Sequence, residues 1–110
     1  MNILDQIIAH KRVEIAERKR VVPVPGGEAF QRSGIRPLDS ALRQPGRISI
    51  LAEFKKASPS KGVIRADAEP VAVAKIYEAH GAAAVSVLTD ARFFQGHADY
   101  LTAIRHQIGL

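Results

Sequence analysis

The first twenty residues carry apolar side chains at helical spacing, with charged side chains between them. The apolar positions are Ile3, Leu4, Ile7, Ile8 and Ile15. This spacing predicts a helix over residues 2–20 with Asn2 as its N-cap. The Pro- and Gly-rich run at 22–27 ends that helix, because both residue types break helices.

Two shorter helical segments are predicted before residue 47. Residues 29–32 could form one turn of helix. Residues 37–43 begin with Pro and stop at Pro45-Gly46, which predicts a second short helix. Residues 1–47 contain no reactive constellation. We therefore expect a helical extension that packs against other structure.

The pattern changes at residue 48. Residues 48–54 are β-branched and apolar over the length of one strand, and a polar loop with Pro and Gly follows over 55–65. Asp67 is the expected N-cap of the next helix, with Pro70 in its first turn. That helix should run to about His80, with Gly81 as the residue that terminates it.

The same order then repeats. Residues 84–88 predict a second strand, 90–96 a loop, and the segment through Leu101 and Ile104 a last helix that ends near Gly109. Strand, loop and helix in this alternation predict a parallel α/β sheet with a right-handed crossover. Two parallel strands alone leave both sheet edges unpaired, so we expect residues 48–110 to be the front of a larger sheet.

Composition narrows the class of protein. The chain has 110 residues, of which 46% are hydrophobic, and this fits one small globular domain. No apolar run approaches the ~18 residues of a membrane span, and the start does not resemble a secretory signal. Cysteine is absent, which excludes disulfides, thiolate metal sites and cysteine nucleophiles. A soluble cytoplasmic protein is the expectation.

The net charge of +5 is concentrated at the front of the chain. Residues 1–47 have a balance of +4, with basic clusters at Lys11-Arg12 and at residues 18–20. Such clusters can bind the phosphates of nucleic acids. Here Glu14 and Glu17 are interleaved and stacking aromatics are lacking, so a solvated helix face is favoured and no nucleic acid is expected. The four histidines form no metal-binding motif, and no metal is expected.

Two charged side chains fall at the end of the first predicted strand. The two-residue period of a strand places Glu53 and Lys55 on one face, opposite Ala52 and Phe54. In parallel barrels, catalytic groups gather at the carboxyl ends of the strands. The alternative is an exposed ion pair of little energetic value.

The loop after this strand has the ingredients of an anion site. Residues 55–62 read Lys-Lys-Ala-Ser-Pro-Ser-Lys-Gly, which supplies three ammonium groups, two hydroxyls and a glycine. The spacing is not that of a nucleotide-binding phosphate loop. Lysine-rich loops are often only solvated, so the residue types alone do not establish an anion site.

Residues 50–62 resemble the signature of the indole-3-glycerol phosphate synthase family. The block Val-Ser-Val-Leu-Thr-Asp at 85–90, followed by Phe-Phe-Gln-Gly at 93–96, is similar to that family's second strand and loop. Residues 3–12 and 36–39 are similar to the helical extension before its first strand. The resemblance implies a division into an N-terminal helical extension, 1–47, and the first two βα units of a (βα)8 TIM barrel, 48–110.

The resemblance also implies a reaction. The family converts 1-(2-carboxyphenylamino)-1-deoxyribulose 5-phosphate to indole-3-glycerol phosphate, losing carbon dioxide and water, without cofactor or metal. Lys55 matches a lysine that contacts the anionic substrate and assists ring closure and dehydration. Glu53 matches a glutamate implicated in proton transfer during dehydration. Ser58 matches a substrate-contacting serine, and Phe94 an aromatic residue that packs on the anthranilate ring. The alternative for Phe94 is a hydrophobic loop anchor.

The resemblance covers only part of such an enzyme, since a whole barrel takes ~250 residues. The family's principal general-acid lysine, its general-base glutamate and its phosphate loops lie on later strands. We therefore expect the chain to be inactive alone, and to act through association with the rest of the barrel or with other tryptophan-pathway enzymes. Two alternatives remain: a small basic module that binds polyanions, and a half-barrel that assembles through its open edges.

Overall fold

A computed structural model describes residues 1–26 and 33–110 of the chain. These residues fall into two compact units, Met1–Ile35 and Arg36–Leu110, and each is described by itself. The helical turn predicted over 29–32 lies outside the described residues. No helix in the described ranges has the length and apolar character needed to cross a membrane.

The first unit contains helix α1, Ile3–Val21. Its N-terminus has a capping box: the Asn2 side chain accepts a hydrogen bond from the Asp5 amide at 2.9 Å, and the Asp5 carboxylate accepts one from the Asn2 amide at 3.3 Å. The predicted helix and its N-cap are confirmed, because two of the backbone donors at the start of the helix are satisfied by local side chains.

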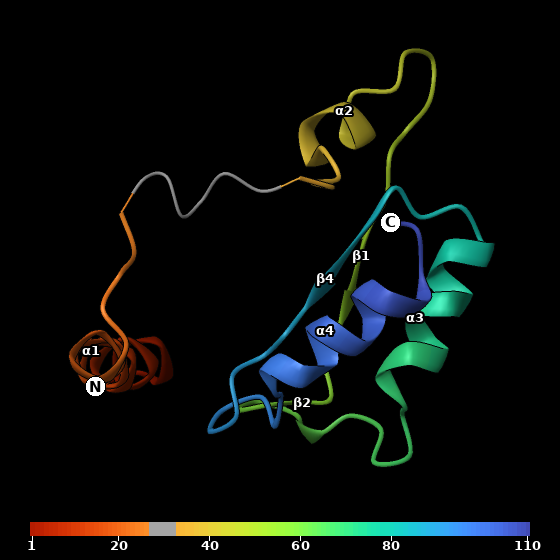
Figure 1. Ribbon diagram of the computed structural model, residues 1–110. Helices are drawn as coiled ribbons and strands as arrows, with labels where there is room; N and C mark the ends of the chain where they lie inside the picture. The colour runs from red at the N-terminus through yellow and green to blue at the C-terminus, as the bar shows by residue number, and fades with distance from the viewer. Residues whose placement is uncertain (27–32) are drawn as a thin grey trace. The chain divides into compact units, whose positions relative to one another are not determined.

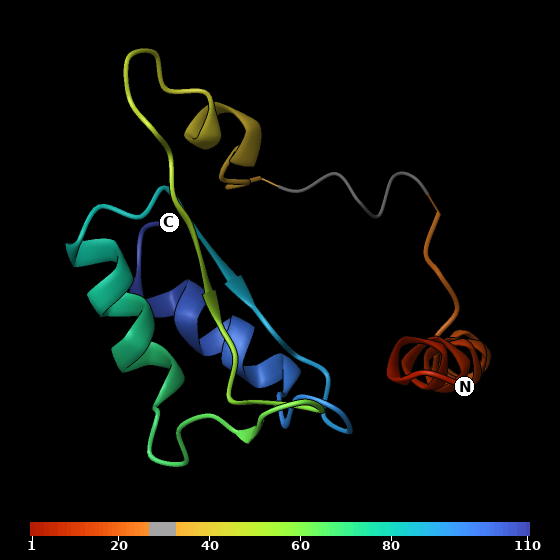
Figure 2. The same cartoon turned by 180° about the vertical axis from the view of Figure 1, so that it is seen from behind.

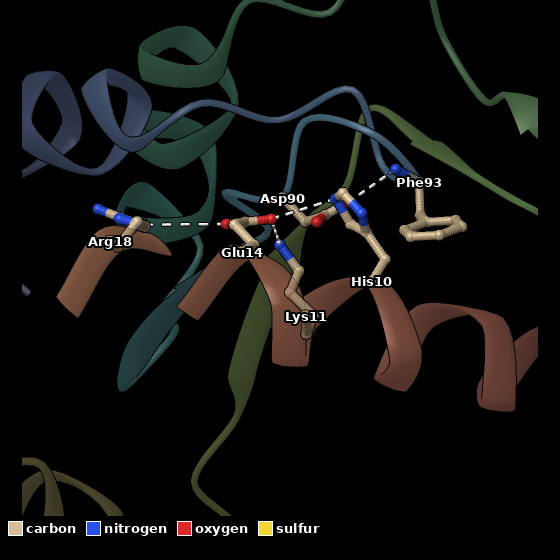
Figure 3. A network of polar contacts seen from close by, with 6 residues as sticks. All are labelled: His10, Lys11, Glu14, Arg18, Asp90 and Phe93. Carbon is tan, nitrogen blue, oxygen red and sulfur yellow. Dashed lines mark hydrogen bonds and ion pairs between the residues drawn. The ribbon is translucent and has the colours of Figure 1, made fainter. Parts of the chain in front are cut away.

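Charged side chains pair with one another along α1. Glu14 lies 2.8 Å from the Lys11 ammonium, 3.3 Å from the His10 ring and 4.0 Å from the Arg18 guanidinium (Figure 3). One turn further on, Arg20 donates two hydrogen bonds to Glu17. These bonds lower the pKa of Glu17 and raise the pKa of Arg20. The basic clusters of α1 are thus interleaved with acidic partners at helical spacing.

The second unit is built on a parallel strand pair. Strands β1, Leu51–Phe54, and β4, Ala84–Val87, pair in parallel with Leu51 opposite Ala84 and Phe54 opposite Val87. Helix α3, Pro70–Ala79, connects them, and helix α4, Ala98–Gln107, follows β4. A short helix α2, Leu38–Leu42, precedes β1. The predicted alternation of strand and helix and the parallel pairing are confirmed.

The first strand is shorter than the predicted 48–54. Ladder pairing begins at Leu51, one residue after Ile50, whose carbonyl accepts a bond from the Ala83 amide at 2.8 Å. Ile48 is 91% exposed. A strand is defined by its neighbour, and β4 runs alongside only from residue 84 onward. The length of the apolar run therefore overestimated the paired segment.

The loop predicted over 55–65 contains a small hairpin. Strands β2, Ala57–Ser58, and β3, Gly62–Val63, pair antiparallel, and the Ile64 amide donates to the Lys56 carbonyl at 2.9 Å. The hairpin itself was not predicted, because strands of two residues are too short to show a period in the sequence. The hairpin gives the loop after β1 a fixed shape.

The N-cap of α3 is Glu69 and not Asp67. The Glu69 carboxylate accepts bonds from the amides of Val71 and Ala72 at 3.0 and 2.7 Å, while Asp67 pairs with Arg65 at 3.1 Å. A longer side chain can therefore cap a helix when Pro70 fixes the first turn. At the other end Gly81 has φ +88°, as expected for the residue that terminates a helix.

Helices α3 and α4 cover one face of the strand pair (Figures 1 and 2). The core beneath them contains Ala74, Ile104 and Ile108, and two valines of β4 pack against it. At the carboxyl end of β1 the buried Phe54 ring meets Tyr100 of α4 edge to face, with centroids 6.2 Å apart. Side chains of β1 that alternate with Phe54 therefore lie on the opposite face.

The chain leaving α4 is held by two side chains from elsewhere in the unit. The Arg36 guanidinium donates to the carbonyls of Ile108 and Leu110 at 2.9 and 2.6 Å. The Glu78 carboxylate of α3 accepts from the Gly109 amide at 2.7 Å. The segment before α2 and helix α3 are thus both hydrogen-bonded to the residues that follow α4.

Candidate active site

The candidate site lies at the carboxyl ends of β1 and β4. Glu53 belongs to β1, and Lys55 follows directly after its last residue. The Tyr77 hydroxyl of α3 donates a hydrogen bond to the Glu53 backbone carbonyl at 3.0 Å. This contact fixes the end of β1 against the helix that follows. In open and closed parallel sheets alike, ligands bind beyond this end of the strands.

The structure brings the Glu53 and Lys55 side chains together. The Lys55 ammonium lies 3.4 Å from Glu53 Oε1. The side chains of Glu53 and Lys55 are 46% and 35% exposed, so both can meet a solute. The expectation from strand alternation that the two emerge on one face is confirmed. A carboxylate and an ammonium at this distance can accept and donate protons to the same bound molecule.

Glu53 has a second partner on the neighbouring strand. Ser86 of β4 is the register partner of Glu53, and its hydroxyl donates to Glu53 Oε2 at 3.2 Å. Each carboxylate oxygen therefore has its own contact, one with Lys55 and one with Ser86.

Phe94 reaches the site from the loop after β4. The Lys55 ammonium lies 5.7 Å from the centre of the Phe94 ring, within the range of a cation–π contact. The loop is shaped by Asp90, whose carboxylate accepts from the Phe93 amide at 2.7 Å (Figure 3) and whose carbonyl accepts from the Gly96 amide at 2.7 Å. Three predicted site residues, Glu53, Lys55 and Phe94, thus meet at one place.

The fourth, Ser58, has a different set of contacts. It lies in β2 of the hairpin, where its hydroxyl accepts from the Lys61 amide at 3.2 Å and lies 3.5 Å from the Ser60 hydroxyl. The hydroxyl therefore organises the lysine-containing turn between β2 and β3. Strand β2 follows Lys55 and Lys56 directly, so three lysines lie within seven residues after the end of β1.

Two residues that touch Glu53 were not predicted. Ser86 is the polar position between two valines in an apolar strand, and alternation alone places it opposite the helix-covered face. That signal was available in the sequence. No signal in the sequence identified Tyr77, because its contact with Glu53 depends on how α3 crosses β1.

Within the described ranges, no group of three or more His, Cys, Asp or Glu residues could hold a metal ion.

Comparisons with known proteins agree on one family. The family model "Indole-3-glycerol phosphate synthase" matches residues 4–110. A protein of that name from Geobacillus kaustophilus (strain HTA426) is 48% identical over 109 residues, which cover 98% of this chain and 40% of the relative. One from Laribacter hongkongensis (strain HLHK9) is 48% identical, covering 94% of this chain and 41% of the relative. A third, from Geobacillus sp. (strain WCH70), is 50% identical with 98% and 40% coverage. The chain spans about 40% of the length of these curated relatives.

Proposed function

The chain belongs to the indole-3-glycerol phosphate synthase family, and on that premise we propose that residues 1–110 supply the front part of such an enzyme. The enzyme is a carboxy-lyase of tryptophan biosynthesis. It converts 1-(2-carboxyphenylamino)-1-deoxyribulose 5-phosphate to indole-3-glycerol phosphate, carbon dioxide and water. The alternative of a polyanion-binding module has no support among the relatives.

The fold proposed for this part is an N-terminal helical extension over 1–47 and two βα units of a (βα)8 barrel over 48–110. Its support is the parallel register of β1 and β4 together with two helices on one face. On the other face Leu51 is 50% exposed. In a complete barrel, side chains on this face are covered by the layered interior. Eight such units take ~250 residues, so the described sheet is a minor part of the wall.

The chemistry needs groups that move protons. A ring carbon of the anthranilate moiety attacks the substrate ketone and forms the new carbon–carbon bond, while the ketone oxygen takes up a proton. Loss of carbon dioxide leaves its electron pair in the ring system. The hydroxyl then departs as water after taking a proton from an acid, while a base removes a proton from the neighbouring carbon, and the carbon–carbon double bond of the indole ring forms. Lys55 contacts the anionic substrate and stabilises the developing oxyanion, and Glu53 takes part in proton transfer during dehydration. No net oxidation occurs, and no cofactor or metal is assigned.

Substrate binding is assigned to the two loops beside the strands. Phe94 packs against the anthranilate ring, and its contact with Lys55 places an aromatic surface next to an ammonium group. Ser58 contacts the substrate from the hairpin. A phosphorylated, carboxylated substrate carries two anionic groups, and such a molecule suits a site flanked by Lys55 and the hairpin that contains Lys61.

The remaining catalytic groups belong to other segments of the barrel. In the family these are a lysine on the third strand, a glutamate on a later strand and the phosphate loops of the last two strands. The 110-residue chain is therefore inactive alone and acts in association with the rest of the barrel, within the cytoplasm. Association with other tryptophan-pathway enzymes is compatible with this role, and neither nucleic acid nor membrane is a partner.

One observation supports the site most strongly: the Lys55 ammonium contacts both Glu53 and Phe94. The test uses a hybrid enzyme in which residues 1–110 replace the matching segment of the Geobacillus kaustophilus relative. Turnover is followed by the fluorescence of the indole product. Lys55→Ala should lower kcat by at least about 100-fold, because it removes a charge that acts in the transition state. Lys75→Ala, on the exposed side of α3, is the matched control and should keep the parent rate. Equal rates for the two variants would contradict the assignment.

A further inference from the structure

Ser86 lies at the candidate site, and the proposed reaction assigns it no role. It lies on β4, in register with Glu53 of β1, and its hydroxyl donates to Glu53 Oε2 at 3.2 Å. Neighbouring residues of β4 point the other way: Val85 and Val87 pack against the core under the helices. Ser86 is therefore a polar side chain on the face of the strand pair that carries the candidate site.

The two contacts of the Glu53 carboxylate differ in kind. Lys55, at 3.4 Å from Oε1, has a long flexible side chain that also contacts Phe94. Under the proposed function its ammonium turns toward the anionic substrate. Ser86 has a short side chain on a paired strand, so its hydroxyl stays within reach of Oε2 when Lys55 moves. Only the serine contact is set by strand register and is independent of the loops.

We propose that Ser86 is a positioning residue that orients the Glu53 carboxylate for proton transfer. Its hydroxyl donates a directional hydrogen bond to Glu53 Oε2, so that Oε1, the oxygen next to Lys55, is the one that exchanges the proton. The Tyr77 hydroxyl supports the same end of β1 through the Glu53 carbonyl. This inference rests on the proposed function, since it assigns a role to Ser86 only through Glu53.

The test compares kcat and KM in the hybrid enzyme defined above. Ser86→Ala should lower kcat by about tenfold, the size expected for one hydrogen bond to a charged group, and leave KM within about twofold. Ser86→Thr keeps the hydroxyl and should restore most of the loss. Ser49→Ala is the matched control: this serine lies before β1, bonds the Ala41 carbonyl, and should not alter kcat. An unchanged kcat in Ser86→Ala, or no rescue by threonine, would overturn the proposal.

A double-mutant cycle distinguishes failure of the Ser86 proposal from failure of the proposed function. Glu53→Gln should lower kcat, and adding Ser86→Ala to it should have no further effect, because the serine acts only through the carboxylate. A full tenfold loss in the Glu53→Gln background would show that Ser86 acts independently, which contradicts positioning. A Glu53→Gln variant with the parent kcat would contradict the proposed function itself.

A second measurement needs no turnover. In the 110-residue chain, three-bond couplings in the NMR spectrum report how the Glu53 side chain is distributed among its rotamers. Ser86→Ala should spread that distribution, and Ser49→Ala should not. An identical distribution in Ser86→Ala and the parent chain would overturn the proposal even where the hybrid enzyme has no measurable activity.

Discussion

The Lys55 ammonium lies 5.7 Å from the centre of the Phe94 ring, so residues from the loops after β1 and β4 meet in one contact. At a partly exposed site such a contact contributes about 0.5–1 kcal/mol. Its larger consequence is geometric, because it sets an aromatic face and a cation side by side at the carboxyl end of a parallel strand pair. A substrate that combines an aromatic ring with anionic groups fits this pairing.

Replacing Phe94 should weaken substrate binding more than it slows chemistry. In the hybrid enzyme, Phe94→Leu should raise KM by roughly fivefold, because about 1 kcal/mol of ring contact is lost. Phe93→Leu is the matched control, since Phe93 lies under the Arg92 guanidinium instead of Lys55. Steady-state kinetics of the two variants gives the comparison. A KM that rises equally in both would make Phe94 a hydrophobic loop anchor.

Gly96 should tolerate no side chain. It is buried, and a Cβ at this position would overlap the Leu88 carbonyl oxygen and lie 2.9 Å from the Thr89 carbonyl carbon. Gly96→Ala should therefore lower the free energy of unfolding of the chain by about 2–3 kcal/mol. Urea unfolding followed by circular dichroism measures it. Gly26→Ala, where a Cβ meets nothing within 4 Å, should change stability by less than about 0.5 kcal/mol. Comparable losses in the two variants would refute the close approach.

Arg36 should stabilise the segment that follows α4. Its guanidinium donates to the carbonyls of Ile108 and Leu110, at a long distance along the chain. Arg36→Ala should lower the free energy of unfolding by about 1–2 kcal/mol, because these carbonyls lose a charged donor. Amide hydrogen exchange in residues 105–110 should accelerate at the same time. Arg43→Ala serves as the control. If the amides of residues 105–110 stay protected in Arg36→Ala, Arg36 does not stabilise this segment.

The end of α1 should weaken in acid. Because Arg20 donates to the Glu17 carboxylate, the pKa of Glu17 lies below its ordinary value of 4.5 in the folded chain. A lowered pKa contributes stability above pH 4.5 that is lost as the pH falls through the folded value. Carbon-13 chemical shifts of residues 17–20 should report less helix at pH 3 than at pH 7. Glu17→Gln should remove the part of this change that Glu17 causes, and an identical titration in that variant would contradict the coupling.

Local sequence patterns were enough to predict the main elements of the fold. The helical period of residues 3–21, the cap at Asn2 and the alternation of strand and helix after residue 48 are encoded within short windows. The start of β1 and the hairpin β2–β3 are not encoded in this way, because strand pairing depends on which segment lies alongside. Glu69 and not Asp67 is the cap, because the helix begins at Pro70 and the N-cap is the residue directly before the first helical residue.

The contacts of the candidate site also fall into two groups, those that a local pattern predicts and those that depend on tertiary packing. The pairing of Glu53 with Lys55 follows from the two-residue period of one strand, so the sequence could predict it. The meeting of Lys55 with Phe94 joins two loops, and the contact of Tyr77 with the Glu53 carbonyl joins a helix to a strand. Such contacts depend on tertiary packing, and no local pattern in the sequence predicts them.

We propose that this chain supplies active-site groups to a synthase that needs further barrel units. The most direct measurement follows indole fluorescence with the carboxyphenylamino-deoxyribulose phosphate substrate. It compares the 110-residue chain alone with the chain mixed with a second polypeptide, the part of the Geobacillus kaustophilus relative beyond its matching segment. We expect no turnover from the chain alone, turnover from the mixture, and its loss with Lys55→Ala. Turnover by the chain alone, or a mixture whose activity is indifferent to Lys55→Ala, would contradict the account.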